Sequence, residues 1–325
     1  MTQPLTPGRW RGLKMTSLDS SIFTILAFDQ RGSFRRMLPS DTLYPDAVQV
    51  KVDVITGLAP HTSAVLLDPV YGLRPALAMT GHSGLLLSLE KTGYTGDPNE
   101  RRLAFIDGWS VEKIKRLGAS AVKLMVYYHP ETGALAEELE ATIHDVVVQC
   151  HQYDLPLFLE PMSYSIDPTF DKGTAEYAAT RCAVVRETAR RLSQTGADVL
   201  KLEFPLDAAF NTDLAAWRSA CAAISEVCTI PWVLLSAGVD FVTFEQQTRI
   251  ACEAGASGFL AGRAIWKECA GMSPADRAHF LATTAKDRTE RLVAIAEQYA
   301  KPWTDFYTMP TGAETWFDDY AGMGG

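Results

Sequence analysis

The sequence of 325 residues lacks the features that mark several classes of protein. Its six cysteines are scattered and form no C-x-x-C pair, which predicts buried thiols in a reducing compartment rather than a disulfide framework. Its six histidines show no H-x-H or H-E-x-x-H spacing, so the sequence gives little support to a metal site. We therefore expect a protein that needs no metal.

Two further absences concern membranes and nucleic acids. The first residues contain no apolar signal core, and no hydrophobic run reaches the length of a membrane-spanning helix. The formal net charge of -9 leaves no basic surplus with which to hold a phosphate backbone. A hydrophobic content of 47% with 21% charged residues is ordinary for a globular enzyme. We expect a cytoplasmic protein with no nucleic-acid partner and no membrane partner.

Apolar runs of strand length recur along the chain, and helix-patterned segments separate most of them. Nearly continuous apolar strands that alternate with helices are typical of a parallel sheet covered on both faces. Such units, repeated without a linker, predict a closed (β/α)8 barrel, the TIM-barrel fold of the α/β class, in one domain of residues 1–325. The eight expected strands span 22–30, 63–69, 84–90, 121–128, 155–162, 198–204, 231–238 and 257–264.

The C-terminal part of the chain extends the expected barrel, whose core spans about residues 22–270. The pattern predicts one long helix over 272–299, followed by a tail that is rich in aromatic residues, glycine and proline. The tail could mediate an oligomer or be a loose end, but we expect it to pack over one end of the barrel because its aromatic side chains are too apolar to leave in water. These side chains are Trp303, Phe306, Tyr307, Trp316 and Phe317.

Charged residues occupy the carboxyl ends of most expected strands. In a barrel of this kind the chemistry gathers at those ends, and a packed apolar core does not need charges there. So many charged side chains at one mouth indicate an active site. They are Asp29 and Arg31 on the first strand, Asp68 on the second, Glu90 and Lys91 on the third, Lys123 on the fourth, Glu160 on the fifth, Lys201 and Glu203 on the sixth, and Arg263 on the eighth.

Lys201 lies in the apolar stretch ADVLKLEFP, residues 197–205. On a strand, Lys201 and Glu203 point to the same face. A buried amine is disfavoured as a cation, and an uncharged amine is a nucleophile toward carbonyl carbon. Lys123, two strands away around the barrel, could approach it. The residues alone leave open which lysine is the nucleophile. Lys201 could instead form a buried ion pair or reach water at the strand end, and Lys123 could instead bind a phosphate or a carboxylate.

Two carboxylates accompany the lysines at this mouth. Glu160 follows the strand between the two lysine strands and is well placed to transfer protons, although it could instead hold a lysine as an ion pair. Asp29 could be a second acid–base group, a hydroxyl-binding group or a salt-bridge partner of a lysine. We therefore expect Lys201, Glu160, Asp29 and Lys123 to share one catalytic pocket.

The last two expected strands end in small residues, Ser236-Ala237-Gly238 and Ala261-Gly262-Arg263. Loops of this kind leave backbone N–H groups free at the place where many barrels bind phosphate, although small residues can also serve only to turn a loop. Arg31 and Arg263 could grip a second anionic group, with surface salt bridges as the alternative. We expect a phosphate site at Ser236, Gly238, Gly262 and Arg263.

The motifs together resemble the class I tagatose-1,6-bisphosphate aldolases and the related sulfofructose-1-phosphate aldolases. The resemblance runs from about residue 22 to residue 266 and is weaker in the C-terminal helix. It rests on LAFDQRG (26–32), LLDPVYGL (66–73), LEKTGY (89–94), AVKLMVYY (121–128), FLEPMSY (158–164), DVLKLEFPL (198–206), LLSAGV (234–239) and LAGRAIW (260–266).

The resemblance implies roles for individual residues. Lys201 matches the Schiff-base lysine and Glu160 the proton-transferring acid, while Asp29 and Lys123 match polar groups of the same pocket. The implied reaction is reversible retro-aldol cleavage of a ketose phosphate to dihydroxyacetone phosphate and an aldehyde, without metal or organic cofactor. The residues expected to bind the substrate and its phosphate are Gln30, Arg31, Ser236, Gly238, Gly262 and Arg263.

Several alternatives stay open at the level of sequence. Tagatose 1,6-bisphosphate is the favoured substrate, and 6-deoxy-6-sulfofructose 1-phosphate is the other, since both carry a second anion. A metal-dependent aldolase would need a histidine cluster, and only His129 lies near a strand end. Another phosphate-binding barrel would not need paired lysines, and a non-catalytic sugar-phosphate-binding barrel would not turn over substrate. A homo-oligomer is also possible.

Overall fold

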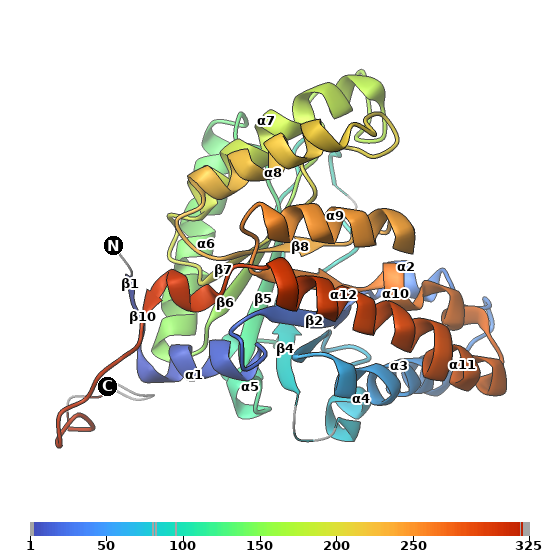
Figure 1. The fold of residues 1–325 in the computed structure, drawn as a ribbon, viewed down its shortest axis with the longest axis horizontal. Helices are drawn as coiled ribbons and strands as arrows, with labels where there is room; N and C mark the ends of the chain where they lie inside the picture. The colour runs from blue at the N-terminus through green and yellow to red at the C-terminus, as the bar shows by residue number, and fades with distance from the viewer. Residues whose placement is uncertain (1–2, 80, 82, 95, 319, 321–325) are drawn as a thin grey trace.

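The computed structural model describes residues 3–79, 81, 83–94, 96–318 and 320, and its centre is a closed barrel of parallel strands (Figure 1). Each strand pairs with its neighbours in chain order, and the last pairs with the first. The predicted eight-stranded barrel is therefore confirmed. Its strands are β2 (Phe23–Phe28), β3 (Ala64–Leu67), β4 (Gly84–Ser88), β5 (Ala121–Tyr127), β6 (Leu157–Met162), β7 (Val199–Leu202), β8 (Trp232–Leu235) and β9 (Gly258–Ala261).

Helices cover the outside of the barrel between successive strands (Figure 1). Several begin where a side-chain oxygen accepts a hydrogen bond from the first turn, as Thr174 and Asp240 do. The helices are α2 (Gly32–Arg35), α3 (Tyr44–Leu58), α4 (Leu73–Ala78), α5 (Val111–Arg116), α6 (Ala134–Gln152), α7 (Ala175–Leu192), α8 (Leu214–Val227), α9 (Phe241–Glu253), α10 (Arg263–Trp266), α11 (Pro274–Phe280) and α12 (Lys286–Tyr299).

Strand register places the charged residues at one end of the barrel. Met125 of β5 lies opposite Glu160 of β6, and Lys201 of β7 lies opposite Val233 of β8. Residues toward the start of the same strands, such as Val122 and Leu157, are apolar and fully buried. Because all eight strands are parallel, their carboxyl ends open at one mouth.

The helix predicted over 272–299 is in fact interrupted, because η3 (Leu281–Ala285), a π-helical segment, separates α11 from α12. The buried positions here are four residues apart, at Arg277, Leu281, Ala285 and Thr289. In an α-helix of 3.6 residues per turn, each such step drifts by about 40° around the axis. The wider π turn cancels part of this drift and keeps the positions on the barrel side.

The tail packs over the amino end of the barrel, as expected, but only in part. Trp303 is fully buried, and its ring meets Trp10 of α1 (Pro7–Met15) edge to face at 4.7 Å. Tyr307 belongs to β10 (Tyr307–Thr308), which pairs with β1 (Gln3–Pro4) (Figure 1). The expectation is wrong for Trp316 and Phe317, which stay 50% and 61% exposed. They follow β10, where the chain has left the barrel end.

Residues 319 and 321–325 of the expected tail lie outside the described residues. Within the part of the chain that the structure describes, no helix combines the length and the apolar character needed to cross a membrane.

Candidate active site

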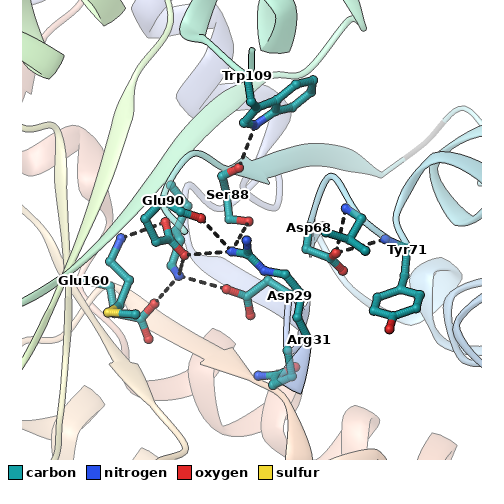
Figure 2. A network of polar contacts seen from close by, with 12 residues as sticks. Asp29, Arg31, Asp68, Tyr71, Ser88, Glu90, Trp109 and Glu160 are labelled. Carbon is teal, nitrogen blue, oxygen red and sulfur yellow. Dashed lines mark hydrogen bonds and ion pairs between the residues drawn. The ribbon is translucent and has the colours of Figure 1, made fainter. Parts of the chain in front are cut away.

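Lys123 is the centre of the polar cluster at the barrel mouth. Its Nζ lies 2.8 Å from Asp29 Oδ2, 2.9 Å from Glu90 Oε1 and 2.7 Å from Glu160 Oε2. Figure 2 shows these three carboxylates converging from different strands. The side chain of Lys123 is only 2% exposed, so water does not replace these partners.

The three carboxylates decide the protonation of Lys123. Burial by itself disfavours the ammonium, but the negative charges of Asp29, Glu160 and Glu90 outweigh it and raise the pKa of Lys123 well above its ordinary value. An amine that stays protonated has no free electron pair for attack on a carbonyl carbon. Lys123 therefore forms the buried ion pair that the sequence left open as the alternative to a nucleophilic amine.

Lys201 has a simpler environment on β7. Its Nζ lies 2.8 Å from Glu160 Oε1, and among the described residues no second carboxylate pairs with it. Glu160 thus bridges the two lysines, with one oxygen toward each. The structure brings together the four predicted pocket residues, and it leaves Lys201 as the less constrained amine.

The pKa values of two carboxylates around Lys123, Asp29 and Glu90, are shifted in different directions. Burial would raise the pKa of Asp29, but the charges of Lys123 and Lys201 overcome it and hold that pKa well below the ordinary range. For Glu90 the balance is opposite, because burial outweighs the attraction of Lys123 and raises its pKa. Two carboxylates on one lysine therefore have pKa values shifted in opposite directions, which is common at catalytic sites.

Glu90 is a structural centre of the site that the sequence analysis did not include among the pocket residues. Besides Lys123, it accepts a hydrogen bond from the backbone N–H of Met125 at 3.0 Å. Arg31 donates to the Glu90 carbonyl at 2.9 Å and to Ser88 Oγ at 3.3 Å (Figure 2). The position of Glu90 at a strand end was the available signal.

The surface salt bridge that was the alternative role for Arg31 is wrong. Its side chain is only 9% exposed and pairs with Glu90 at 3.4 Å, so it forms no surface salt bridge. Its guanidinium is directed into the polar cluster and holds Glu90 and Ser88 in place (Figure 2). Arg31 therefore positions Glu90 within the polar cluster.

Two other charged strand ends lie apart from the cluster. Asp68 is fully buried, pairs with Lys51 of α3, and accepts the backbone N–H groups of Val70 and Tyr71 (Figure 2). Glu203, beyond the end of β7, pairs with Lys172 and lies 3.9 Å from Arg181. Neither carboxylate reaches Lys201, so these two serve local structure.

The loops after β8 and β9 meet at the mouth. Gly262 N–H donates to Ser236 Oγ at 3.4 Å, and a Cβ on Gly262 would lie 2.7 Å from the Ala27 carbonyl oxygen. Gly238 has φ of +85°, and a Cβ there would lie 3.0 Å from Arg263 Cζ. Both positions thus require glycine, and the four residues expected to bind phosphate lie together.

Gln30 joins these loops from β2. Its Nε2 lies 3.3 Å from the position that a Cβ on Gly262 would occupy, and its Oε1 is buried without a hydrogen-bond partner among the described residues. Gln30 therefore lies beside Gly262.

Within the described residues, the side chains at the mouth are not arranged as metal ligands. In the described part of the chain, no cluster of three or more His, Cys, Asp and Glu side chains is arranged to hold a metal ion. The three carboxylates that converge near β5 surround the ammonium of Lys123 instead. His129 lies near Tyr164 and is not part of this cluster.

A parallel eight-stranded barrel with an amine and a carboxylate in contact at its mouth is an arrangement suited to enzymes that act on carbonyl substrates through a lysine imine. The family model described as "DeoC/LacD family aldolase" matches residues 23–268. This match covers more than half of the chain and includes every strand of the barrel. The chain belongs to the DeoC/LacD family of aldolases.

Similar proteins are found among curated sequences and solved structures. The chain is 32% identical to tagatose 1,6-diphosphate aldolase 2 of Streptococcus agalactiae, covering 93% of this chain and 99% of that protein. It is also 32% identical to the tagatose 1,6-diphosphate aldolase of Lactococcus lactis, with the same coverage. An archaeal fructose 1,6-bisphosphate aldolase matches with a TM-score of 0.60 and 19% identity over 88% of this chain and 98% of that one, which shows a shared fold.

Proposed function

We propose that this protein is a class I aldolase that cleaves tagatose 1,6-bisphosphate reversibly to dihydroxyacetone phosphate and glyceraldehyde 3-phosphate. The observation that carries the proposal is the pair Lys201–Glu160, in which an amine and a carboxylate lie 2.8 Å apart beside an ammonium that is already neutralised. The relatives named for this substrate match the chain over almost its whole length, which supports the choice of substrate.

The reaction begins at Lys201. Glu160 takes a proton from the Lys201 ammonium, and the free amine attacks C2 of the ketose to form a carbinolamine. Glu160 returns the proton to the carbinolamine hydroxyl, which leaves as water. The product is an iminium that joins C2 to Nζ and attracts electrons from the neighbouring bond.

Cleavage uses the same carboxylate a second time. Glu160 accepts the proton of the C4 hydroxyl while the C3–C4 bond breaks, and the bond electrons move into the iminium to give an enamine. Glyceraldehyde 3-phosphate leaves as the aldehyde. The enamine is protonated at C3, and water then releases dihydroxyacetone phosphate and restores the Lys201 amine.

The neighbouring residues orient the reacting pair. Lys123 binds the second oxygen of Glu160 at 2.7 Å, and this contact fixes the rotation of the carboxylate while its other oxygen faces Lys201. Asp29, which is 8% exposed, can bind a substrate hydroxyl from the open side of the pocket. Preorganised contacts of this kind act on the transition state without reorganisation.

The substrate phosphate at C1 binds between the loops after β8 and β9. Ser236, Gly238, Gly262 and Arg263 lie together there, and backbone N–H groups with one guanidinium suit a phosphate. Gln30 adds a side-chain amide to the same corner. The first of these loops follows β8, the neighbour of the Lys201 strand β7. This closeness suits a ketose whose phosphate is on C1 and whose reacting carbon is C2.

Trapping with borohydride tests this function. Incubation with dihydroxyacetone phosphate and sodium borohydride, followed by mass spectrometry of peptides, is expected to show the reduced adduct on Lys201. Turnover by a protein that forms no adduct would contradict the proposal. A chelator is expected to leave the rate unchanged, and a complete loss of activity would favour a metal-dependent aldolase.

Two substrates complete the test. Rates with tagatose 1,6-bisphosphate and 6-deoxy-6-sulfofructose 1-phosphate are compared at equal concentration, and the bisphosphate is expected to be cleaved with the higher kcat/KM. We also propose that the enzyme acts in the cytoplasm, since its six cysteines are free thiols. Assembly into a homo-oligomer remains a prediction.

A further inference from the structure

A cavity lies beside the barrel mouth, between the segments 98–101 and 163–172. Its volume is about 220 Å³, and residues of both segments line it together with Tyr127 and Met162. At about 30 Å³ for each water, this space holds about seven waters, enough for a phosphate group and its ligands. The mechanism proposed above leaves the cavity without a role.

Arg101 is the main charged group of this cavity. Its Cζ lies 4.5 Å from the ring centroid of Tyr127, 5.7 Å from that of Tyr94 and 5.9 Å from that of Tyr164. Its Nε donates to the Pro98 carbonyl at 3.0 Å. Aromatic rings contact the face of a guanidinium and leave its in-plane N–H groups free. Among the described residues, none accepts a hydrogen bond from the two terminal nitrogens.

Lys172 brings a second cation to the cavity. Its Nζ donates to the Ser163 carbonyl at 2.9 Å and pairs with Glu203, so one of the three ammonium hydrogens is left for another acceptor. Asp171 is the one carboxylate among the residues found to line the cavity, and it is exposed to solvent. The ion pair with Glu203 offsets the charge of Lys172, so Arg101, which pairs with no carboxylate among the described residues, is the cation that favours an anionic ligand.

The cavity lies on the path of a bound ketose. Met162, which lines it, is two residues beyond Glu160 on the same face of β6, a distance of about 6.6 Å along a strand. The proposed C1 phosphate loops follow β8 and β9, on the other side of Lys201 and its strand β7. A ketose held at C1 and joined to Lys201 at C2 therefore extends its last carbons toward β6, β5 and this cavity.

We propose that Arg101 and Lys172 form a subsite for the anionic group at the far end of the ketose, a phosphate or a sulfonate on C6. This inference rests on the proposed aldolase function and defines where that enzyme distinguishes its substrates. Arg101 is the specificity-determining residue, because its planar fork offers paired N–H donors to oxygens of a tetrahedral anion. Lys172 adds charge and is held in place by Glu203.

The test measures kcat/KM of the full-length enzyme and its variant Arg101→Met with two substrates, tagatose 1,6-bisphosphate and tagatose 1-phosphate. The variant is expected to lose about 10- to 100-fold with the bisphosphate, as for a lost charge-assisted hydrogen-bond pair. The rate with the monophosphate is expected to stay within about twofold, because that substrate has no group for the subsite. Arg102→Met is the matched control, since Arg102 already donates to both oxygens of exposed Glu138.

The outcomes separate this inference from the proposed function. Equal losses with the two substrates would mean that Arg101 only supports the loop, and no loss with the bisphosphate would mean that the anion binds elsewhere; either result overturns the subsite. Dihydroxyacetone phosphate needs no far-end anion, so its borohydride adduct on Lys201 is expected to form in Arg101→Met as in the wild type. Absence of this adduct in the wild type would overturn the function and the subsite together. A parallel loss with 6-deoxy-6-sulfofructose 1-phosphate would support a subsite that accepts sulfonate as well.

Discussion

The two ends of the barrel both contain buried charges, but the charges are used differently. At the carboxyl end, Lys123 contacts three carboxylates, one of which also contacts Lys201. At the amino end, Asp198 accepts two hydrogen bonds from Arg9 of α1, at 2.6 and 3.0 Å, and one from the Leu157 N–H at 2.8 Å. The first network joins strand ends to one another, and the second ties a helix to the barrel.

Exposure is the clearest difference between these networks. Asp198 is completely buried, whereas Asp29 and Glu160 each remain 8% exposed and can meet a molecule that enters the mouth. The Tyr307 hydroxyl also donates to the Asp198 carbonyl at 2.6 Å, so the C-terminal tail closes the amino end. Charge at the open end is available for chemistry, and charge at the closed end holds the fold together, which is the usual division in barrel enzymes.

The nearby cations explain why the pKa values of the two aspartates are shifted in opposite directions. Asp29 has Lys123 and Lys201 beside it, and their charges lower its pKa although burial opposes them. Burial outweighs the charges of Arg9 and His151 at Asp198, so the pKa of Asp198 is raised. Burial by itself therefore does not identify a functional carboxylate; its set of partners does.

The largest effect is expected from removal of the Lys201 amine at the open end. Lys201→Met and Lys201→Arg should each lower kcat by at least about 10⁴-fold, as is usual for loss of a nucleophile. The arginine variant keeps a cation beside Glu160, so it separates the role of charge from that of the amine. Steady-state cleavage assays measure the loss, with exposed Lys14→Met on α1 as the control. Activity near the wild-type level in Lys201→Arg would remove Lys201 from the mechanism.

The barrel and the open-end charges could be predicted from the sequence because both depend on local pattern. Apolar runs of strand length, separated by helical periodicity, predict the strands, and a charge at the end of such a run has only the mouth to occupy. Lys201 and Glu160 were identified in this way. The resemblance to known aldolases added their implied roles and did not change the list of residues.

The parts that were missed depend on contacts between distant segments. No local signal shows that Arg31 turns inward to Glu90, or that Arg101 packs on Tyr127 across the mouth. The apolar tail could not reveal that Trp303 finds Trp10 while Trp316 remains exposed. The turn at η3 likewise follows from the spacing of buried positions, which becomes visible only when the packing is known.

A substitution at the closed end should lower the free energy of unfolding rather than the activity. Asp198→Ala leaves the Arg9 guanidinium and the Leu157 N–H without their buried acceptor, and such a loss costs about 3 kcal/mol of unfolding free energy. Urea unfolding followed by circular dichroism measures this change. The folded fraction is expected to keep kcat within about twofold of the wild type, since the residue is distant from the mouth. A large loss of kcat without loss of stability would contradict the division between the two ends.

The open-end network should show its own pH dependence of stability. Asp29 has a lowered pKa in the folded protein, so its ionised form stabilises the fold above the unfolded pKa of about 3.9, and this contribution is lost as the pH falls further. Asp29→Asn is expected to cost about 2 kcal/mol at pH 7 and clearly less at pH 3. Urea unfolding of both proteins at these pH values gives the difference. A difference that does not change with pH would mean that the charge of Asp29 contributes nothing.

The smallest effect is expected at the boundary of the closed end. Trp303 is fully buried against Trp10 and Phe23, and its indole N–H donates to Ser17 Oγ at 3.0 Å, whereas Trp316 is half exposed. Trp316→Ala should therefore change the free energy of unfolding by less than about 0.5 kcal/mol, while Trp303→Ala should cost about 3 to 5 kcal/mol. Thermal unfolding of the two variants makes the comparison. A loss of unfolding free energy at Trp316 similar to that at Trp303 would contradict this prediction. It would mean that Trp316 is buried and that the tail beyond β10 also stabilises the closed end.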